Sequence, residues 1–131
     1  MAEGKWMENI AWSNLCKLSP KKGGNPGKKL QEAQRDICRE ILQCEIDTYK
    51  PTHILFVTGY KYWFEHFADI FENVNNYSER NVSRGSDKNY VFVEATATYY
   101  NGVKVVVSCR PERRPKEQFV DAVVSAFGVN S

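Results

Sequence analysis

The chain has 131 residues, of which 42% are hydrophobic and 26% are charged. This length allows one domain with a genuine core that needs no disulfide or metal for stability. Eighteen Lys and Arg residues oppose sixteen Asp and Glu residues, and the resulting net charge of +2 does not by itself identify a nucleic-acid-binding protein.

The four cysteines argue against a metal centre. Cys16, Cys38, Cys44 and Cys109 form no C-x-x-C pair and lie near no histidine doublet, a pattern that excludes a typical zinc site and a disulfide scaffold. We expect reduced thiols and no cofactor. No apolar run approaches the roughly 20 residues that span a bilayer, and no signal peptide is evident. We therefore expect a cytoplasmic protein without a membrane partner.

The first half of the chain predicts a short strand and a long helix. Residues 8–18 alternate loosely between polar and apolar and are expected to form the strand. Asn25 is a suitable N-cap, and Pro26 suits the first helical position because it lacks an N–H. Helical spacing of apolar residues predicts a helix over about 26–50. Its apolar stripe comprises Leu30, Ala33, Ile37, Ile41 and Ile46, with Cys38 and Cys44 in the core or at its boundary.

The middle of the chain predicts a buried strand and a second helix. Residues 52–58 are nearly all apolar between Pro51 and Gly59, which is typical of a strand buried on both faces of a parallel sheet. A wide apolar stripe predicts a helix over about 60–74, whose aromatic residues are expected to pack in the core. Residues 75–88 are polar and are expected to form a loop.

The last third predicts a hairpin and a final helix. Residues 90–99 have strand character, and Asn101-Gly102 is the strongest short hairpin signal. The partner strand is expected over 103–108 and the last helix over about 115–127. The resulting order is β, α, β, α, β-hairpin, α. It indicates a single α/β domain over 1–131, a three-layer α/β/α sandwich with a mostly parallel central sheet.

A basic loop follows the strand at 103–108. In open α/β sheets, ligands bind at the carboxyl ends of strands, where helix amino termini supply N–H donors. The loop therefore predicts an anionic ligand, and the alternative is a solvated connection. A second basic segment, residues 17–29, has five lysines and no acidic residue. The basic residues of the loop are Arg110, Arg113, Arg114 and Lys116, opposed by Glu112 and Glu117.

Three segments taken in order resemble the uracil-DNA glycosylase superfamily. These are Ala-Trp-Ser-Asn-Leu-Cys-Lys-Leu at 11–18, Gly-Asn-Pro at 24–26, and Lys-Pro-Thr-His-Ile-Leu-Phe-Val-Thr-Gly at 50–59. The likeness extends over about residues 9–128, because the final strand, loop and helix also follow the family pattern. It implies a domain of DNA repair proteins in which a flipped nucleotide enters a pocket at the strand ends, with DNA or a nucleotide as partner.

The resemblance also assigns candidate residues. Asn14 takes the place of the family's base-reading asparagine, whose amide offers the acceptor and donors that uracil requires. The alternative for Asn14 is an ordinary residue of a strand end or turn. The expected phosphate or anion ligands are Lys17, Arg110, Arg113, Arg114 and Lys116.

Two departures from the family pattern bear on activity. The family's Gly-rich loop with its catalytic acidic residue has no counterpart, because only about nine residues precede the similar region. We therefore expect an amino-terminally shortened version. Arg110 stands where the family has a histidine, and arginine stabilises an anion but does not shuttle a proton near neutral pH. The family's iron–sulfur branch has an amino-terminal cysteine pair that is absent here, so we expect no cluster.

These observations leave the function open between two classes. The first hypothesis is a glycosylase-like domain that binds nucleic acid or a nucleobase and is catalytically impaired, with true base excision only where another segment supplies the missing motif. The second is a non-catalytic domain that self-associates or completes a larger protein, because a shortened sheet exposes an edge or an apolar face. A Cys109 nucleophile activated by Arg110 is a further alternative.

Overall fold

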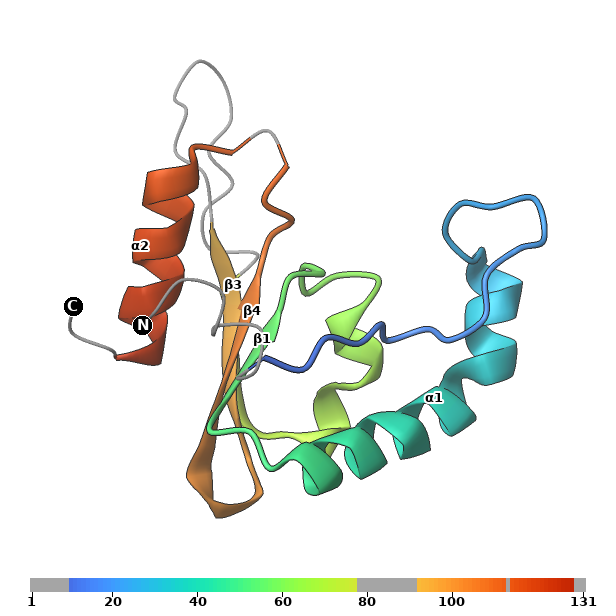
Figure 1. The fold of residues 1–131 in the computed structure, drawn as a ribbon, viewed down its shortest axis with the longest axis horizontal. Helices are drawn as coiled ribbons and strands as arrows, with labels where there is room; N and C mark the ends of the chain where they lie inside the picture. The colour runs from blue at the N-terminus through green and yellow to red at the C-terminus, as the bar shows by residue number, and fades with distance from the viewer. Residues whose placement is uncertain (1–9, 78–91, 113, 129–131) are drawn as a thin grey trace. The chain divides into compact units, whose positions relative to one another are not determined.

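The computed structural model describes residues 10–77, 92–112 and 114–128 (Figure 1). The chain divides into two compact units, Met1–Lys50 and Pro51–Ser131. Each unit is described by itself, and the expectation of one domain over 1–131 stays a prediction. In the described ranges, no helix combines the length and the apolar character needed to cross a membrane.

The first unit is built on α1, which spans Lys28–Tyr49. The predicted helix is therefore confirmed, but its predicted start is two residues early. Gly27 occupies the N-cap position, so Asn25 is not the cap and Pro26 is not the first helical residue. At the other end, Lys50 adopts the left-handed conformation and closes the helix, because the proline that follows it disfavours a further helical residue.

Residues 10–18 do not form a strand, so the prediction for 8–18 is wrong in its described part. The backbone N–H groups of Lys17 and Leu18 both donate to Oε1 of Gln34, at 2.9 Å each. Nε2 of Gln34 donates in turn to the carbonyl oxygen of Leu18, at 2.9 Å. A buried side chain of α1 thus satisfies the backbone groups that a neighbouring strand would otherwise satisfy.

This arrangement sets the buried face of α1. Gln34, Cys38 and Ile46 are buried, whereas Ile37, part of the predicted apolar stripe, is 62% exposed. Cys44 is also exposed, so its predicted place at the core is wrong. The buried face of α1 includes Gln34 because the side-chain amide of Gln34 bonds to the backbone of residues 17 and 18.

The second unit contains a mixed four-stranded sheet, which confirms the α/β class. The strands are β1 (His53–Phe56), β2 (Glu72–Asn76), β3 (Val93–Tyr99) and β4 (Val103–Ser108). Their spatial order is β1-β4-β3-β2. Only β1 and β4 pair in parallel, and β3 pairs antiparallel with both β2 and β4. The expectation of a mostly parallel sheet is therefore wrong for the described strands.

Burial is concentrated on the central strand β4. Val105, Val106 and Val107 are each at most 1% exposed. In contrast, β1 lies at the edge of the described sheet, and Phe56 is its buried residue. The expectation that this strand is buried on both faces is wrong, because β4 takes the inner position beside it.

The predicted helix over 60–74 is absent. Two short 3-10 turns, Phe64–His66 and Ala68–Ile70, are followed directly by β2. Tyr62 has a φ of 73°, a left-handed value that no residue within an α-helix adopts. Of the predicted loop over 75–88, residues 75 and 76 belong to β2, and residues 78–88 lie outside the described part of the chain.

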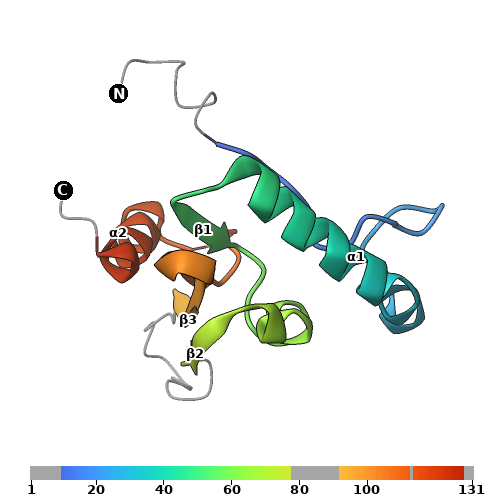
Figure 2. The ribbon, with the colours of Figure 1, turned by 90° about the horizontal axis from the view of Figure 1, so that it is seen from below.

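The aromatic residues of this region form a core against the sheet, as the sequence predicts for their packing. The Phe64 ring lies 5.1 Å from the Phe56 ring and 5.4 Å from the Phe71 ring, measured between centroids. Helix α2 covers the opposite face, as Figures 1 and 2 both show. Its Phe127 ring contacts His53 of β1, with centroids 5.2 Å apart.

The hairpin and the last helix are confirmed. The connection between β3 and β4 is the three-residue turn Tyr100–Gly102, in which Asn101 and Gly102 have φ values of 67° and 78°, a left-handed conformation that asparagine and glycine adopt most readily. Helix α2 spans Lys116–Phe127. Strand β3 begins at Val93, and residues 90 and 91 of the predicted strand lie outside the described residues.

The turn generates a prediction about stability. Replacing Gly102 with Val should lower the free energy of unfolding by about 1–3 kcal/mol, because a β-branched residue at positive φ is strained. No heavy atom lies within 4 Å of a Cβ placed there, so the cost comes from the backbone alone. Gly102→Asn is the matched control, since Asn tolerates this conformation. Urea unfolding measures both, and equal losses for Val and Asn would contradict the turn assignment.

Candidate functional site

The carboxyl ends of β1 and β4 meet at one edge of the sheet. The N–H of Gly59, in the loop after β1, donates to the carbonyl oxygen of Ser108 at 2.8 Å. The hydroxyl of Ser108 donates to the carbonyl oxygen of Cys109 at 3.0 Å. The loops after the two strands are therefore held side by side. We call residues 58–63, 108–112 and 114–116, together with Glu94, the strand-end site.

Glu94 of β3 anchors the loop that follows β1. Its Oε1 accepts a hydrogen bond from the N–H of Tyr60 at 2.9 Å. Gly59 has a φ of 79°, and a Cβ at that position would lie 3.5 Å from the same oxygen. Glycine is favoured here by the left-handed backbone, because a Cβ would make only an ordinary contact with the carboxylate.

The sequence does not single out Glu94 as a site residue, because Glu94 lies within a segment whose alternating pattern predicts an ordinary strand. A signal for it exists, since Glu94 is the only acidic residue between Asp87 and Glu112. A lone carboxylate in an apolar strand has to find hydrogen-bond donors. The backbone N–H of Tyr60 is one of them.

Cys109 is buried beside charged groups. Burial raises the pKa of the Cys109 thiol, while the hydrogen bond and charge of Arg114 act in the opposite direction without outweighing it. The charge of Glu94 adds to the increase. The thiol is therefore neutral at pH 7, and the geometry gives no support to Cys109 as a nucleophile.

Arg110 is an exposed cation of the site. Its guanidinium carbon lies 5.8 Å from the centroid of the Trp63 ring, which is within the range of a cation–π interaction. Lys116, also exposed, is the first residue of α2. The structure thus places Arg110 and Arg114 in the loop after β4 and Lys116 at the start of α2, whereas Arg113 lies outside the described residues.

The start of α2 adds backbone donors to this loop. The N-cap residue is Pro115, which makes no side-chain hydrogen bond to the helix. Free N–H groups in the first turn of a helix and the positive end of its dipole favour anions. Glu117 is the acidic residue of that turn and partly offsets this charge.

The two remaining candidates, Asn14 and Lys17, belong to the first unit. The ammonium of Lys17 lies 2.8 Å from Oε1 of Glu45 and 2.6 Å from Oγ of Ser13, and it also donates to the carbonyl oxygen of Asn14. Burial acts to raise the pKa of Glu45, but the hydrogen bonds from Lys17 and Ser13 outweigh it and lower the pKa. Lys17 is therefore engaged within its unit, and its role as a phosphate ligand stays a prediction.

Asn14 is exposed, and its role in reading a base also stays a prediction. The other lysines of the basic segment, Lys21, Lys22, Lys28 and Lys29, are exposed as well. The base-reading candidate and the loop cations thus fall in different units of the chain.

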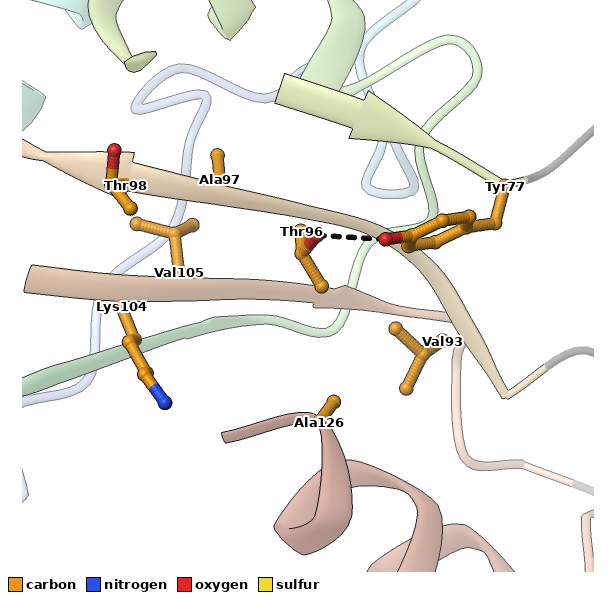
Figure 3. Close-up of a pocket in the computed structure, with 8 residues that line it drawn as sticks. All are labelled: Tyr77, Val93, Thr96, Ala97, Thr98, Lys104, Val105 and Ala126. Atoms are coloured by element: carbon orange, nitrogen blue, oxygen red, sulfur yellow. Dashed lines mark hydrogen bonds between the residues drawn. The ribbon is translucent and has the colours of Figure 1, made fainter. Parts of the chain in front are cut away.

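A separate hollow of about 500 Å³ lies between β3, β4 and the end of α2 (Figure 3). Its lining includes Tyr77, whose hydroxyl lies 3.3 Å from that of Thr96. Lys104 is also part of the lining, and its ammonium donates to the carbonyl oxygen of Phe127 at 2.9 Å. The sequence does not reveal this hollow, because it exists only once α2 packs on the threonine-bearing face of β3.

Neither a cluster of metal ligands nor a similar known protein indicates what the strand-end site binds. Within the described ranges, no three His, Cys, Asp or Glu side chains are grouped as metal ligands, and the four cysteines are free thiols. No family model, curated protein or solved structure matches this chain. The resemblance to uracil-DNA glycosylases therefore stays a prediction.

The bonds of Gln34 generate a second prediction. Gln34→Leu should lower the free energy of unfolding by about 1–3 kcal/mol, because it removes the partners of backbone groups at residues 17 and 18. Gln43→Leu, an equal change at an exposed position of α1, should have little effect. Chemical denaturation compares the two variants. If both are as stable as the wild type, the amide does not hold this segment.

A third prediction concerns thiol reactivity. At neutral pH, iodoacetamide should modify the exposed Cys44 well before the buried Cys38 and Cys109, because attack requires an accessible thiolate. Peptide mass spectrometry at successive times measures each site, and the unfolded protein serves as the control in which all react. Native Cys109 reacting as fast as Cys44 would revive the nucleophile alternative.

Proposed function

We propose that this chain binds nucleic acid at the strand-end site without cleaving it efficiently. The observation that carries the proposal is the exposed guanidinium of Arg110 over the Trp63 ring at the carboxyl end of β4. An arginine fixed on an aromatic face presents its donors in a defined plane, which suits the oxygens of a phosphate. Lys116 and the first turn of α2 follow Arg110 in the chain and supply further donors.

The proposal takes the domain to be a variant of the glycosylase-like three-layer fold. Two features support this. Parallel strands β1 and β4 end at the same edge of the sheet, and the loop after β4 leads directly into α2. This is the strand, loop and helix order on which the resemblance rests.

Impaired catalysis follows from the groups present. Arg110 does not release a proton near neutral pH. The thiol of Cys109 is neutral, and the carboxylate of Glu94 is engaged by the N–H of Tyr60. The two histidines, His53 and His66, lie outside the strand-end site as defined. These features support the proposal that catalysis is impaired.

A second candidate function is self-association through β1. This strand is the edge of the described sheet, and its Leu55 is 42% exposed. Edge strands offer unpaired backbone groups to another chain. A homodimer formed in this way would show twice the monomer mass in light scattering, and a monomer at high concentration would remove this candidate.

The fourth prediction tests the nucleic-acid proposal. Fluorescence anisotropy with labelled single-stranded and uracil-containing duplex DNA, between about 50 and 200 mM salt, should show affinity that falls steeply as salt rises. Arg110→Ala should weaken binding about tenfold and reduce the salt slope by about one. Lys104→Ala removes the same charge at the opposite end of β4 and should leave binding unchanged.

Binding by the wild-type protein tests whether the chain binds nucleic acid, and the comparison of the two variants tests where it binds. No binding at the lowest salt would refute nucleic-acid binding. Salt-sensitive binding that Arg110→Ala and Lys104→Ala weaken equally would show that general surface charge, rather than the strand-end site, holds the ligand.

A further inference from the structure

We infer that Tyr62, next to the Trp63–Arg110 pair, forms a stacking platform for unpaired bases, so that the ligand class is single-stranded nucleic acid. This inference rests on the proposed function, since the phosphates of such a strand would lie on Arg110 and its neighbours. It gives the loop after β1 a role that differs from the core packing predicted for the apolar stripe over 60–74.

Exposure and charge distinguish this loop from the aromatic core beside it. Tyr62 is 66% exposed, whereas Phe64, two residues on, is fully buried. The ammonium of Lys61 lies 5.5 Å from the centroid of the Tyr62 ring, and the guanidinium carbon of Arg110 lies 5.8 Å from that of Trp63. Two consecutive rings thus each carry a cation, one supplied by the loop itself and one by the loop after β4.

The backbone presents the Tyr62 ring in a fixed way. Tyr62 has a φ of 73°, and its N–H donates to Oε1 of Glu65 at 3.0 Å. The N–H of Glu65 donates to the carbonyl oxygen of Tyr60 at 2.9 Å. Because Glu94 holds the N–H of Tyr60, the loop is anchored on both sides of the exposed ring. A preformed platform costs less conformational entropy when a ligand binds.

The pairing of rings with cations favours an unpaired strand over other ligands. Proteins that bind single strands combine aromatic faces for the bases with cations for the backbone. In a duplex, the base faces are already stacked on one another and are not available to a side chain. A protein partner would use the exposed ring of Tyr62, but it would gain nothing from the two cations unless it were itself polyanionic.

The test compares a short oligothymidine with an abasic deoxyribose-phosphate strand of the same length and label. Both carry the same charges, and only the first can stack. The wild-type protein should bind the oligothymidine at least about fivefold more tightly, the lower end expected for one stacked base. This arm uses no variant, so it does not depend on how a substitution folds.

The variant arm replaces Tyr62 with Asn, which tolerates the left-handed backbone and removes the ring. Tyr62→Asn should weaken binding to oligothymidine at least about fivefold and leave binding to the abasic strand unchanged. Tyr100→Ser, at a residue of the hairpin that is 72% exposed, is the matched control and should alter neither.

The possible outcomes separate the inference from the function on which it rests. Equal, salt-sensitive affinity of the wild type for both strands would overturn the stacking platform and leave phosphate binding in place. No binding to either strand at low salt would overturn both. Preference for oligothymidine that survives Tyr62→Asn would place the stacking elsewhere and refute the platform.

Discussion

The hydrogen bond from the N–H of Tyr60 to the carboxylate of Glu94 is the interaction on which the strand-end site depends. It joins the loop after β1 to β3, although β4 lies between these two strands in the sheet. The bond is favoured by glycine at position 59, where the backbone is left-handed. The turn that follows can then present Tyr62 outward and set Trp63 under Arg110.

The sheet supplies the rigid frame for this arrangement. β4 is buried by β1 and β3 at its sides and by aromatic residues and α2 on its faces, so its carboxyl end is a fixed point from which the basic loop departs. The charged groups at that end differ in their exposure to solvent. Arg110 and Lys116 are exposed, whereas Arg114 lies against the buried thiol of Cys109 and acts on its pKa. In the proposed function, ligand binding therefore falls to the exposed pair.

Local signals in the sequence are sufficient to predict the elements whose structure depends on neighbouring residues. Asn101-Gly102 specified the hairpin, and apolar spacing specified α2 and most of α1. Elements that depend on distant partners were not predictable in the same way. Residues 10–18 look like a strand but bond to Gln34 instead. The stripe over 60–74 has helical spacing, yet its aromatic residues reach the core from 3-10 turns. Of the site, Arg110, Arg114 and Lys116 were found from their charge, while Glu94, Tyr62 and Trp63 required the folded chain.

Titration of the isotope-labelled protein with a short single strand, followed by amide and indole NMR signals at low salt, shows whether nucleic acid binds at the strand-end site. We expect saturable shifts at the Trp63 indole and at the amides of residues 58–63, 108–110, 112, 114 and 116. The amides of Asn101 and Gly102, at the other end of the sheet, should not move. Shifts centred on the hairpin or the hollow beside Lys104, with the strand-end site unaffected, would contradict this expectation.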